Sequence, residues 1–313
     1  VLADAEEDFS TFLWNWLADL LDDAVDDGYY KSNPIEDLIG RTRRRHTELN
    51  EVRDALTKKT FTLREEQALL ERVFADLTGE NSGLAIGFLI RFFTGMPPTQ
   101  ICALRCGNYK HIPHSKDYQF LVYEQIPSSG PSEPKPLRRP EEYRRIPVSP
   151  LLQEKIERHI AALNRAADPS APAEDRYIVF PPSGLANDST PCRAKQLNDY
   201  CKKIIEAVEI PHIVLTLPDE ELGVRETDLN VYHGDIFRSN FRYRVLETCG
   251  FTNSECNYFL GLQLTNTFSK HYCDFTNLFS QLAMVTKLRR WCALYQPSHN
   301  DVPYHIEIRD SRS

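Results

Sequence analysis

The apolar and polar positions along the chain recur mainly with the period of an α-helix. Residues 8–28 place their apolar side chains at helical spacing opposite an acidic face. Residues 61–77 repeat this pattern, and Thr62 followed by Glu65 predicts a capping box at the start of that helix. Residues 84–94 are apolar on nearly every face, so we expect this helix at the centre of the core.

Helical periodicity returns at 151–166, at 193–207 and, with short turns, from 232 to the end. In this last region we expect Arg244 at the surface and Tyr243 in the core. The helix from about Asn277 to Leu294 has an apolar face formed by Leu278, Phe279, Leu282, Val285, Leu288 and Trp291. That face packs either on a neighbouring subunit or back on its own domain, and the sequence leaves both alternatives open.

The segment between these helices predicts a small β-sheet. Residues 117–126 alternate as a strand does, 127–142 form a proline-rich loop, and 143–149 return as a second strand. A short strand leading into a turn is expected at 176–184, and the polar stretch 211–230 is interpreted as an inserted hairpin. The predicted fold class is therefore mainly α with a small antiparallel β-sheet (α+β).

Charge changes this picture at two places. The chain has a formal net charge of −8, which argues against a general nucleic-acid binder. The acidic side chains concentrate in residues 1–40, most simply as a solvated helix face, and the rest of the chain is close to neutral. The basic run 41–46, with Arg43, Arg44 and Arg45, is interpreted as a linker or as a contact to the DNA backbone.

The eight cysteines form no CxxC pair and lie mostly in apolar helical surroundings. This usage is typical of reduced thiols in a cytoplasmic protein. The longest apolar run is too short to cross a membrane, and no secretory signal is recognisable. Because the sequence opens on Val1 and an acidic helix, we expect a fragment whose preceding part is missing or processed.

Four stretches together resemble the phage integrase (tyrosine recombinase) family. They are TGMPPTQICALRCGNY at 94–109, YRRIPVSPLLQEKI at 143–156, FRSNFRYRVLETCGF at 237–251 and LGLQLTNTFSKHY at 260–272. In addition, DDAVDDGYYKSNPI at 22–35 resembles the last helix of the family's core-binding domain and the turn that leaves it. The order and the spacing of these stretches carry the similarity across essentially the whole chain.

The resemblance implies a tyrosine-recombinase catalytic-domain fold at 51–313, preceded at 1–50 by the C-terminal part of a core-binding domain and a linker. It implies an enzyme of DNA recombination and integration, as in mobile elements, that acts on double-stranded DNA as a homotetramer without a metal or a cofactor. Tyr272 would attack a phosphodiester, Arg238 would hold the phosphate, and Lys135 would be the general acid. His233 and His271 would assist proton transfer.

Contacts to phosphates are predicted for a set of arginines, with a solvated surface as the alternative. Four of them surround the expected β-turn and the fifth lies one helical turn after Arg238: Arg138, Arg139, Arg144, Arg145 and Arg242.

Three positions depart from the family pattern. Asp235 stands where the family has a histidine three residues before the arginine, and His233 lies five residues before Arg238. Pro97 stands where the family has its first arginine, and Leu262 stands where it has its third-box histidine. Such losses leave strand cleavage impaired or abolished unless another group substitutes, and the sequence offers Arg91, Arg105, His233 and His271. A non-catalytic DNA-binding or protein-interaction module with the recombinase fold is therefore the alternative.

Overall fold

The computed structural model describes Leu21 and residues 60–129, 133–137, 143–166, 172–182, 189–208, 213–219, 223–229, 235–262 and 274–295. The chain divides into two compact units, of which the larger comprises Lys58–Pro211 and Tyr232–Ser313. The smaller unit comprises Val1–Thr57 and His212–Val231. The expected domain boundary near residue 50 lies outside the described residues and stays a prediction.

The larger unit is mostly helical, as predicted. Its α-helices are α3 (Leu63–Asp76), α4 (Ser82–Thr94), α5 (Pro98–Ile101), α6 (Pro150–Ala166), α7 (Ala194–Ala207), α8 (Ile236–Tyr243), α9 (Asn253–Leu260) and α11 (Leu278–Cys292). Shorter turns are η1 (Cys106–Asn108), η3 (Ala173–Asp175), the π-helical η5 (Arg244–Thr248) and η6 (Ala293–Tyr295). Within the described ranges, none of the helices has the length and apolar character that a membrane span requires.

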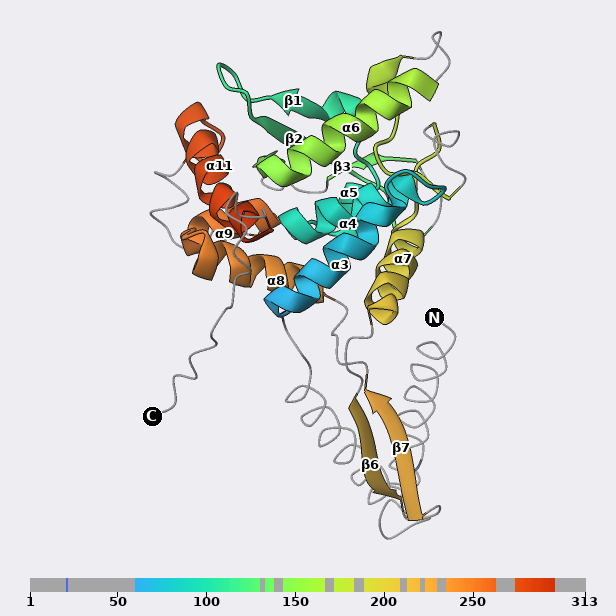
Figure 1. The fold of residues 1–313 in the computed structure, drawn as a ribbon. Coiled ribbons are helices and arrows are strands. Elements are labelled where there is room, and N and C mark those ends of the chain that lie inside the picture. The colour runs from blue at the N-terminus through green and yellow to red at the C-terminus, as the bar shows by residue number, and fades with distance from the viewer. Residues whose placement is uncertain are drawn as a thin grey trace, which may run out of the picture. The chain divides into compact units, whose positions relative to one another are not determined.

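Helix α4 lies at the centre and contacts α3, α6, α7 and α8 (Figure 1). All of its side chains are buried, which confirms the expectation from its continuous apolar sequence. The predicted capping box of α3 is also present: Thr62 Oγ1 accepts from the Glu65 backbone N–H, and the Glu65 carboxylate accepts from the Thr62 N–H. Gly95, with φ of 63°, ends α4 in the left-handed conformation that glycine tolerates.

Two small antiparallel sheets lie in the same unit. One has the strand order β1 (Tyr109–His111), β2 (Tyr118–Val122) and β5 (Arg144–Pro147), and the other pairs β3 (Glu124–Gln125) with β4 (Lys135–Pro136). In the first sheet Phe120 pairs with Ile146, so the two strands predicted on either side of the proline-rich loop do pair. The observed architecture is thus α+β.

The short strand expected at 176–184 is wrong within its described part. Tyr177 forms only an isolated bridge with Arg105. The neighbouring N–H of Ile178 donates to Leu104, while the carbonyl of Val179 accepts from Cys192. Leu104 and Cys192 belong to two different segments, so residues 177–179 do not form a continuous series of β-sheet hydrogen bonds with either one.

The polar stretch 211–230 does contain the expected hairpin, made of β6 (Ile213–Asp219) and β7 (Gly223–Leu229). Its register pairs Ile213 with Leu229 and Asp219 with Gly223. This hairpin belongs to the smaller unit, so it is an insertion between α7 and α8 of the larger one.

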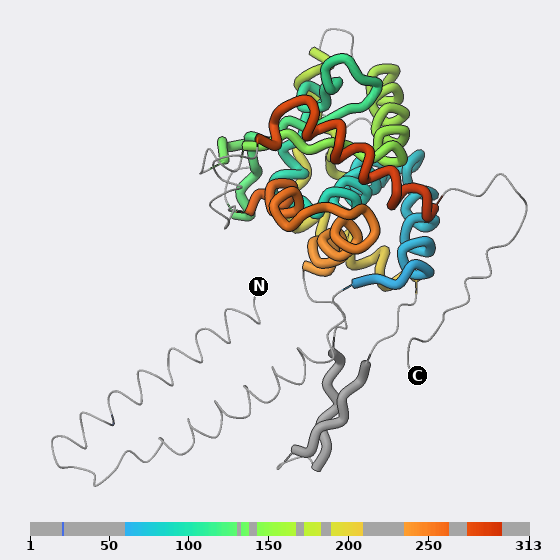
Figure 2. The backbone as a smooth tube through the Cα atoms, turned by 90° about the vertical axis from the view of Figure 1, so that its left-hand side faces the viewer, coloured from blue at the N-terminus to red at the C-terminus, as the bar shows by residue number. Residues whose placement is uncertain are grey.

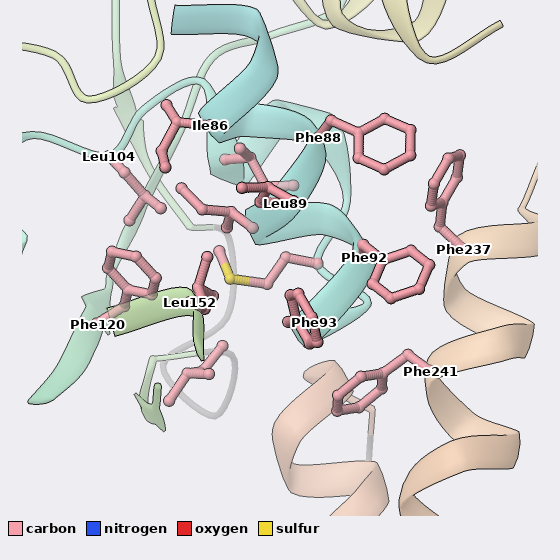
Figure 3. Close-up of a cluster of buried hydrophobic side chains, with 14 of the residues drawn as sticks. Ile86, Phe88, Leu89, Phe92, Phe93, Leu104, Phe120, Leu152, Phe237 and Phe241 are labelled. Carbon is pink, nitrogen blue, oxygen red and sulfur yellow. The ribbon is translucent and has the colours of Figure 1, made fainter. Parts of the chain in front are cut away.

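Aromatic rings join α4 to α8 in the core. Figure 3 shows Phe88 and Phe92 of α4 facing Phe237, with Phe241 one turn further along α8. The Phe88 and Phe237 rings are 5.1 Å apart in an edge-to-face arrangement, the geometry that aromatic pairs prefer. Trp291 is fully buried and packs 5.1 Å from Phe93, which ties α11 to the same core.

Helix α11 packs on its own domain, against β5, α6 and η5 (Figure 2). Of the two alternatives left open by the sequence, the chain by itself adopts the second. The predicted apolar face is partly wrong because Phe279 is 83% exposed. The buried face is rotated and consists of Gln281, Met284, Val285, Leu288, Trp291 and Cys292.

The placement expected for Tyr243 and Arg244 is also wrong. Tyr243 is 45% exposed, whereas Arg244 lies largely buried and pairs with Glu66 of α3. The Arg244 Nε atom is 2.9 Å from the Glu66 carboxylate, which is itself fully buried. A buried carboxylate needs a charged partner, and that requirement draws the arginine inward.

Candidate active site

The last turn of α9 is the point where the motif segments meet. Helix α9 starts with a capping box between Thr252 and Glu255 and ends at Gly261, whose φ is 66°. The turn after α4 packs directly on this end, because a Cβ atom on Gly95 would lie 2.7 Å from Leu260 Cδ2. The same Cβ would lie 2.9 Å from the Phe241 ring of α8. Residues near 95, 241 and 260 therefore form one packed corner.

Arg238 of α8 reaches the same corner. Its Nη2 group donates to the carbonyl oxygen of Leu260 at 3.2 Å, and its side chain is half-buried. Carbonyl groups at a helix C-terminus carry partial negative charge, so a guanidinium is stabilised there. Within the described part of the chain this is its one side-chain hydrogen bond, and a guanidinium has five N–H donors. Donors therefore remain that can bind an anion.

Arg144 of β5 approaches the α9 end from a different element. Its Nε group donates to the carbonyl of Phe259 at 3.0 Å, and its Nη2 group donates to Oε1 of Gln100 at 2.7 Å. The guanidinium lies so close to Gly261 that a Cβ there would be 2.7 Å from Nη1. Arg144 is only 3% exposed, so its charge is enclosed by protein rather than presented to solvent.

Exposed cations lie near this corner. Arg145 follows Arg144 on β5 and is exposed, and its backbone is fixed by Tyr258 of α9, whose hydroxyl donates to the Arg145 carbonyl at 3.1 Å. Arg242 is exposed one helical turn after Arg238. Both Arg242 and Arg238 act on Cys256 of α9, where they oppose the burial that raises the pKa of this thiol to about 11. That thiol is therefore protonated near neutral pH and a poor nucleophile.

Lys135 lies in β4 with an exposed side chain. Its strand partner is Gln125 of β3, and the next residue, Ile126, donates its N–H to the carbonyl of Thr99 at 2.8 Å. Since Thr99 belongs to α5, the sheet of β3 and β4 that carries Lys135 adjoins the same short helix that supplies Gln100.

The structure describes both Pro97 and Leu262, two of the departures from the family pattern. Pro97 is half-buried and is the N-cap residue of α5, while Leu262 follows Gly261 and is 40% exposed. Arg91 and Arg105, proposed as substitutes for the missing arginine, are engaged elsewhere. Arg91 donates to Asn198 of α7 at 2.7 Å, and Arg105 donates to the Tyr177 hydroxyl at 3.4 Å.

Several of the predicted site residues lie outside the described part of the chain. They are Tyr272, His271, His233, Arg43, Arg44, Arg45, Arg138 and Arg139. Among the residues that are described, the structure brings Arg238 and Arg144 together on consecutive carbonyls of α9. The described residues contain no cluster of three or more His, Cys, Asp or Glu side chains that could hold a metal ion.

The partners of Arg144 were not predicted. Gln100 is 44 residues away in sequence and Phe259 is 115 residues away, so no local spacing connects them. One signal was available: β5 alternates buried and exposed positions, so Arg144 shares its inward face with Ile146. An arginine on the apolar face of a strand indicates a buried, hydrogen-bonded cation.

Comparison with known proteins adds a weak likeness. No protein family matches the sequence, and no curated protein matches it either. A crystal structure of XerA recombinase is similar with a TM-score of 0.44 and 11% sequence identity. The likeness covers 77% of this chain but only 65% of that one, so the chain spans slightly less than two thirds of its length.

Proposed function

We propose that the chain is a tyrosine-recombinase-like protein that acts on double-stranded DNA. The observation that carries this proposal is the meeting of the motif segments at the end of α9, where Gln100, Arg144, Arg238 and Gly261 lie together. These residues come from the four stretches on which the family resemblance rests, and a shared site requires such stretches to converge.

In this proposal Arg238 holds a backbone phosphate. Its fork binds two non-bridging oxygens as negative charge develops, which is the interaction that guanidinium geometry favours. The Tyr272 hydroxyl gives its proton to His271 or His233 as its oxygen attacks phosphorus. The bond to the 5′ oxygen breaks, and Lys135 gives a proton to the leaving oxygen. The products are a 3′-phosphotyrosyl link and a free 5′-hydroxyl, and reversal of these steps rejoins the strand.

A second candidate is a DNA-binding protein that keeps the fold but does not cut. It is favoured by Pro97 and Leu262, which place a ring without an N–H and an aliphatic side chain where the family pattern has cationic groups. Loss of one electrostatic contact to a transition state typically reduces the rate by about 10²–10³-fold. Two losses together would leave binding as the remaining activity.

Trapping of a covalent adduct separates the two candidates. The full chain is incubated with nicked suicide duplexes that tile the DNA flanking its own gene, and adducts are resolved on a denaturing gel. We expect an adduct with the wild type and with Tyr243→Phe, an exposed tyrosine that serves as the control. Tyr272→Phe should abolish it. DNA binding without any adduct would instead support the second candidate.

Salt dependence tests the phosphate contact in either case. The logarithm of the affinity for a duplex falls linearly with the logarithm of salt, by about 0.9 for each phosphate neutralised. Arg238→Gln should therefore make the slope shallower by about 0.9. Undetectable binding of the wild type at low salt would contradict both candidates and favour a protein-interaction module.

A further inference from the structure

We propose that Arg144 is a positioning residue for Arg238, so that this buried arginine fixes the phosphate-binding one without touching DNA itself. The inference rests on the proposed function, because it assumes that Arg238 contacts a backbone phosphate. The sequence predicts that Arg144 binds phosphate directly, but the protein groups that surround its guanidinium favour a positioning role instead.

The two guanidinium groups share one turn of helix. Arg144 binds the carbonyl of Phe259 and Arg238 binds the carbonyl of Leu260, the next residue along α9. These carbonyls lie in the last turn of the helix, where no N–H group of the helix itself is placed to donate to them. The position of the Leu260 oxygen, and so of the Arg238 group that it holds, depends on how firmly this last turn is fixed.

Arg144 fixes that turn from three directions. Its Nε group donates to the Phe259 carbonyl, its Nη2 group donates to Gln100 of α5, and its guanidinium group packs against Gly261. Gly261 has the left-handed φ of 66° and leaves no room for a Cβ atom. The buried cation therefore joins β5, α5 and α9 at the corner where Arg238 arrives.

Direct contact with DNA does not fit this geometry. Arg144 is 97% buried, and the two hydrogen bonds above commit its Nε and Nη2 groups to protein acceptors. A phosphate would have to break these bonds before it could bind. Arg238 differs because it is half-buried and makes one hydrogen bond among the described residues. Because Nη2 is bound to the Leu260 carbonyl, the motion of the Arg238 guanidinium is restricted before DNA binds, which lowers the entropy cost of a bidentate contact.

The test measures the salt slope, that is, how steeply the logarithm of the affinity of the full chain for a duplex falls with the logarithm of salt. The duplex has about 30 base pairs of mixed sequence, or about 100 Å at 3.4 Å per pair, which is long enough to cover one protein. Arg144→Gln is compared with Arg176→Gln. Arg176 is also nearly buried and also donates to a side-chain amide, that of Asn164, but it does not contact α9 in any described bond. Both variants lose one positive charge, so a general charge effect cancels between them.

A second pair perturbs the site without changing charge. Gly261→Ala forces its Cβ against the Arg144 guanidinium, whereas at Gly250→Ala the nearest atom is Arg290 Nη1 at 3.2 Å. Both glycines have a positive φ, 66° and 73°, so backbone strain is matched. Gln100→Met provides a milder variant that removes the side-chain amide, and with it the acceptor for Arg144 Nη2, and circular dichroism verifies that each protein is folded.

We expect Arg144→Gln and Gly261→Ala to make the slope shallower by about 0.9, as Arg238→Gln does. The double variant Arg144→Gln with Arg238→Gln should lose no further contact, and the Arg176 and Gly250 variants should keep the wild-type slope. If Arg238→Gln changes the slope while Arg144→Gln, Gly261→Ala and Gln100→Met do not, the inference is wrong and the proposed function stands. If Arg238→Gln itself has no effect, both fail.

Discussion

His159 is a buried imidazole on α6 whose protonation opposes folding. It is 5% exposed, its Nε2–H donates to the Ile178 carbonyl at 3.0 Å, and its ring stacks on Phe180. Burial lowers the pKa of His159 from 6.5 to about 4, although the hydrogen bond to Ile178 acts in the opposite direction. As pH falls, the unfolded chain therefore binds this proton before the folded chain does. The contribution of the neutral His159 to stability is fully present above about pH 6.5 and is lost as pH falls towards about 4.

We predict that the free energy of unfolding decreases by about 2 kcal/mol from this group between about pH 7.5 and pH 5. Urea unfolding at the two pH values measures the loss. His159→Gln keeps a donor for Ile178 but does not titrate, so its stability should depend less on pH by the same amount. Equal pH dependence in the two proteins would show that His159 is not the responsible group.

At the scale of single residues, the sequence predicts candidate arginines but not the residues that they contact. The helical motif predicts Arg238 as a phosphate-binding residue, and the structure places that arginine at the end of α9, where it donates to the Leu260 carbonyl. The sequence did not predict that Tyr243 is exposed and Arg244 largely buried, because the partner of Arg244 is Glu66, which lies 178 residues earlier. Spacing along the chain carries no information about such a partner.

Close packing of α4 depends on glycines inside the helix. A Cβ atom on Gly83 would lie 2.6 Å from Phe180 Cδ2 and 2.7 Å from the Phe180 carbonyl oxygen. We predict that Gly83→Ala lowers the unfolding free energy by about 2 kcal/mol, because overpacking of about 3 kcal/mol exceeds the helix-propensity gain of about 1 kcal/mol. Urea unfolding measures it. Gly79→Ala, whose Cβ would have its nearest atom at 3.9 Å, is the control and should change little.

Whole elements were predicted best where their signals are local. The capping box of Thr62 and Glu65 and the continuous apolar run of α4 depend only on neighbours in sequence, and both are observed. The face of α11 was predicted partly wrongly because the core meets the side of the helix that carries Gln281 and Leu288, and Phe279 lies on the opposite side. Residues 176–182 have the composition of a strand, but pairing needs a partner that the composition does not supply.

Across the whole molecule, Glu66 links the two ends of the larger unit. This fully buried carboxylate on α3 accepts hydrogen bonds from Asn240 at 2.6 Å, from Arg244 at 2.9 Å and from the Tyr295 hydroxyl. Tyr295 also accepts from the Trp291 indole of α11 at 2.7 Å. One acidic side chain thereby joins the first described helix of this unit to α8, η5 and its last described residues.

We predict that Glu66→Leu destabilises the larger unit by about 3–5 kcal/mol, because it leaves the largely buried Arg244 charge and two further donors without their acceptor. Glu71→Leu makes the same change at an exposed position of α3 and should alter stability by about 0.5 kcal/mol or less. Urea unfolding, followed by far-ultraviolet circular dichroism, gives both values. Because Glu66 connects distant elements, its loss should lower the midpoint of one cooperative transition while the slope with urea stays the same. Separate transitions for the helices would mean that α3 and α11 are not coupled through this residue, and a loss comparable to that of Glu71→Leu would mean that the network contributes little to folding.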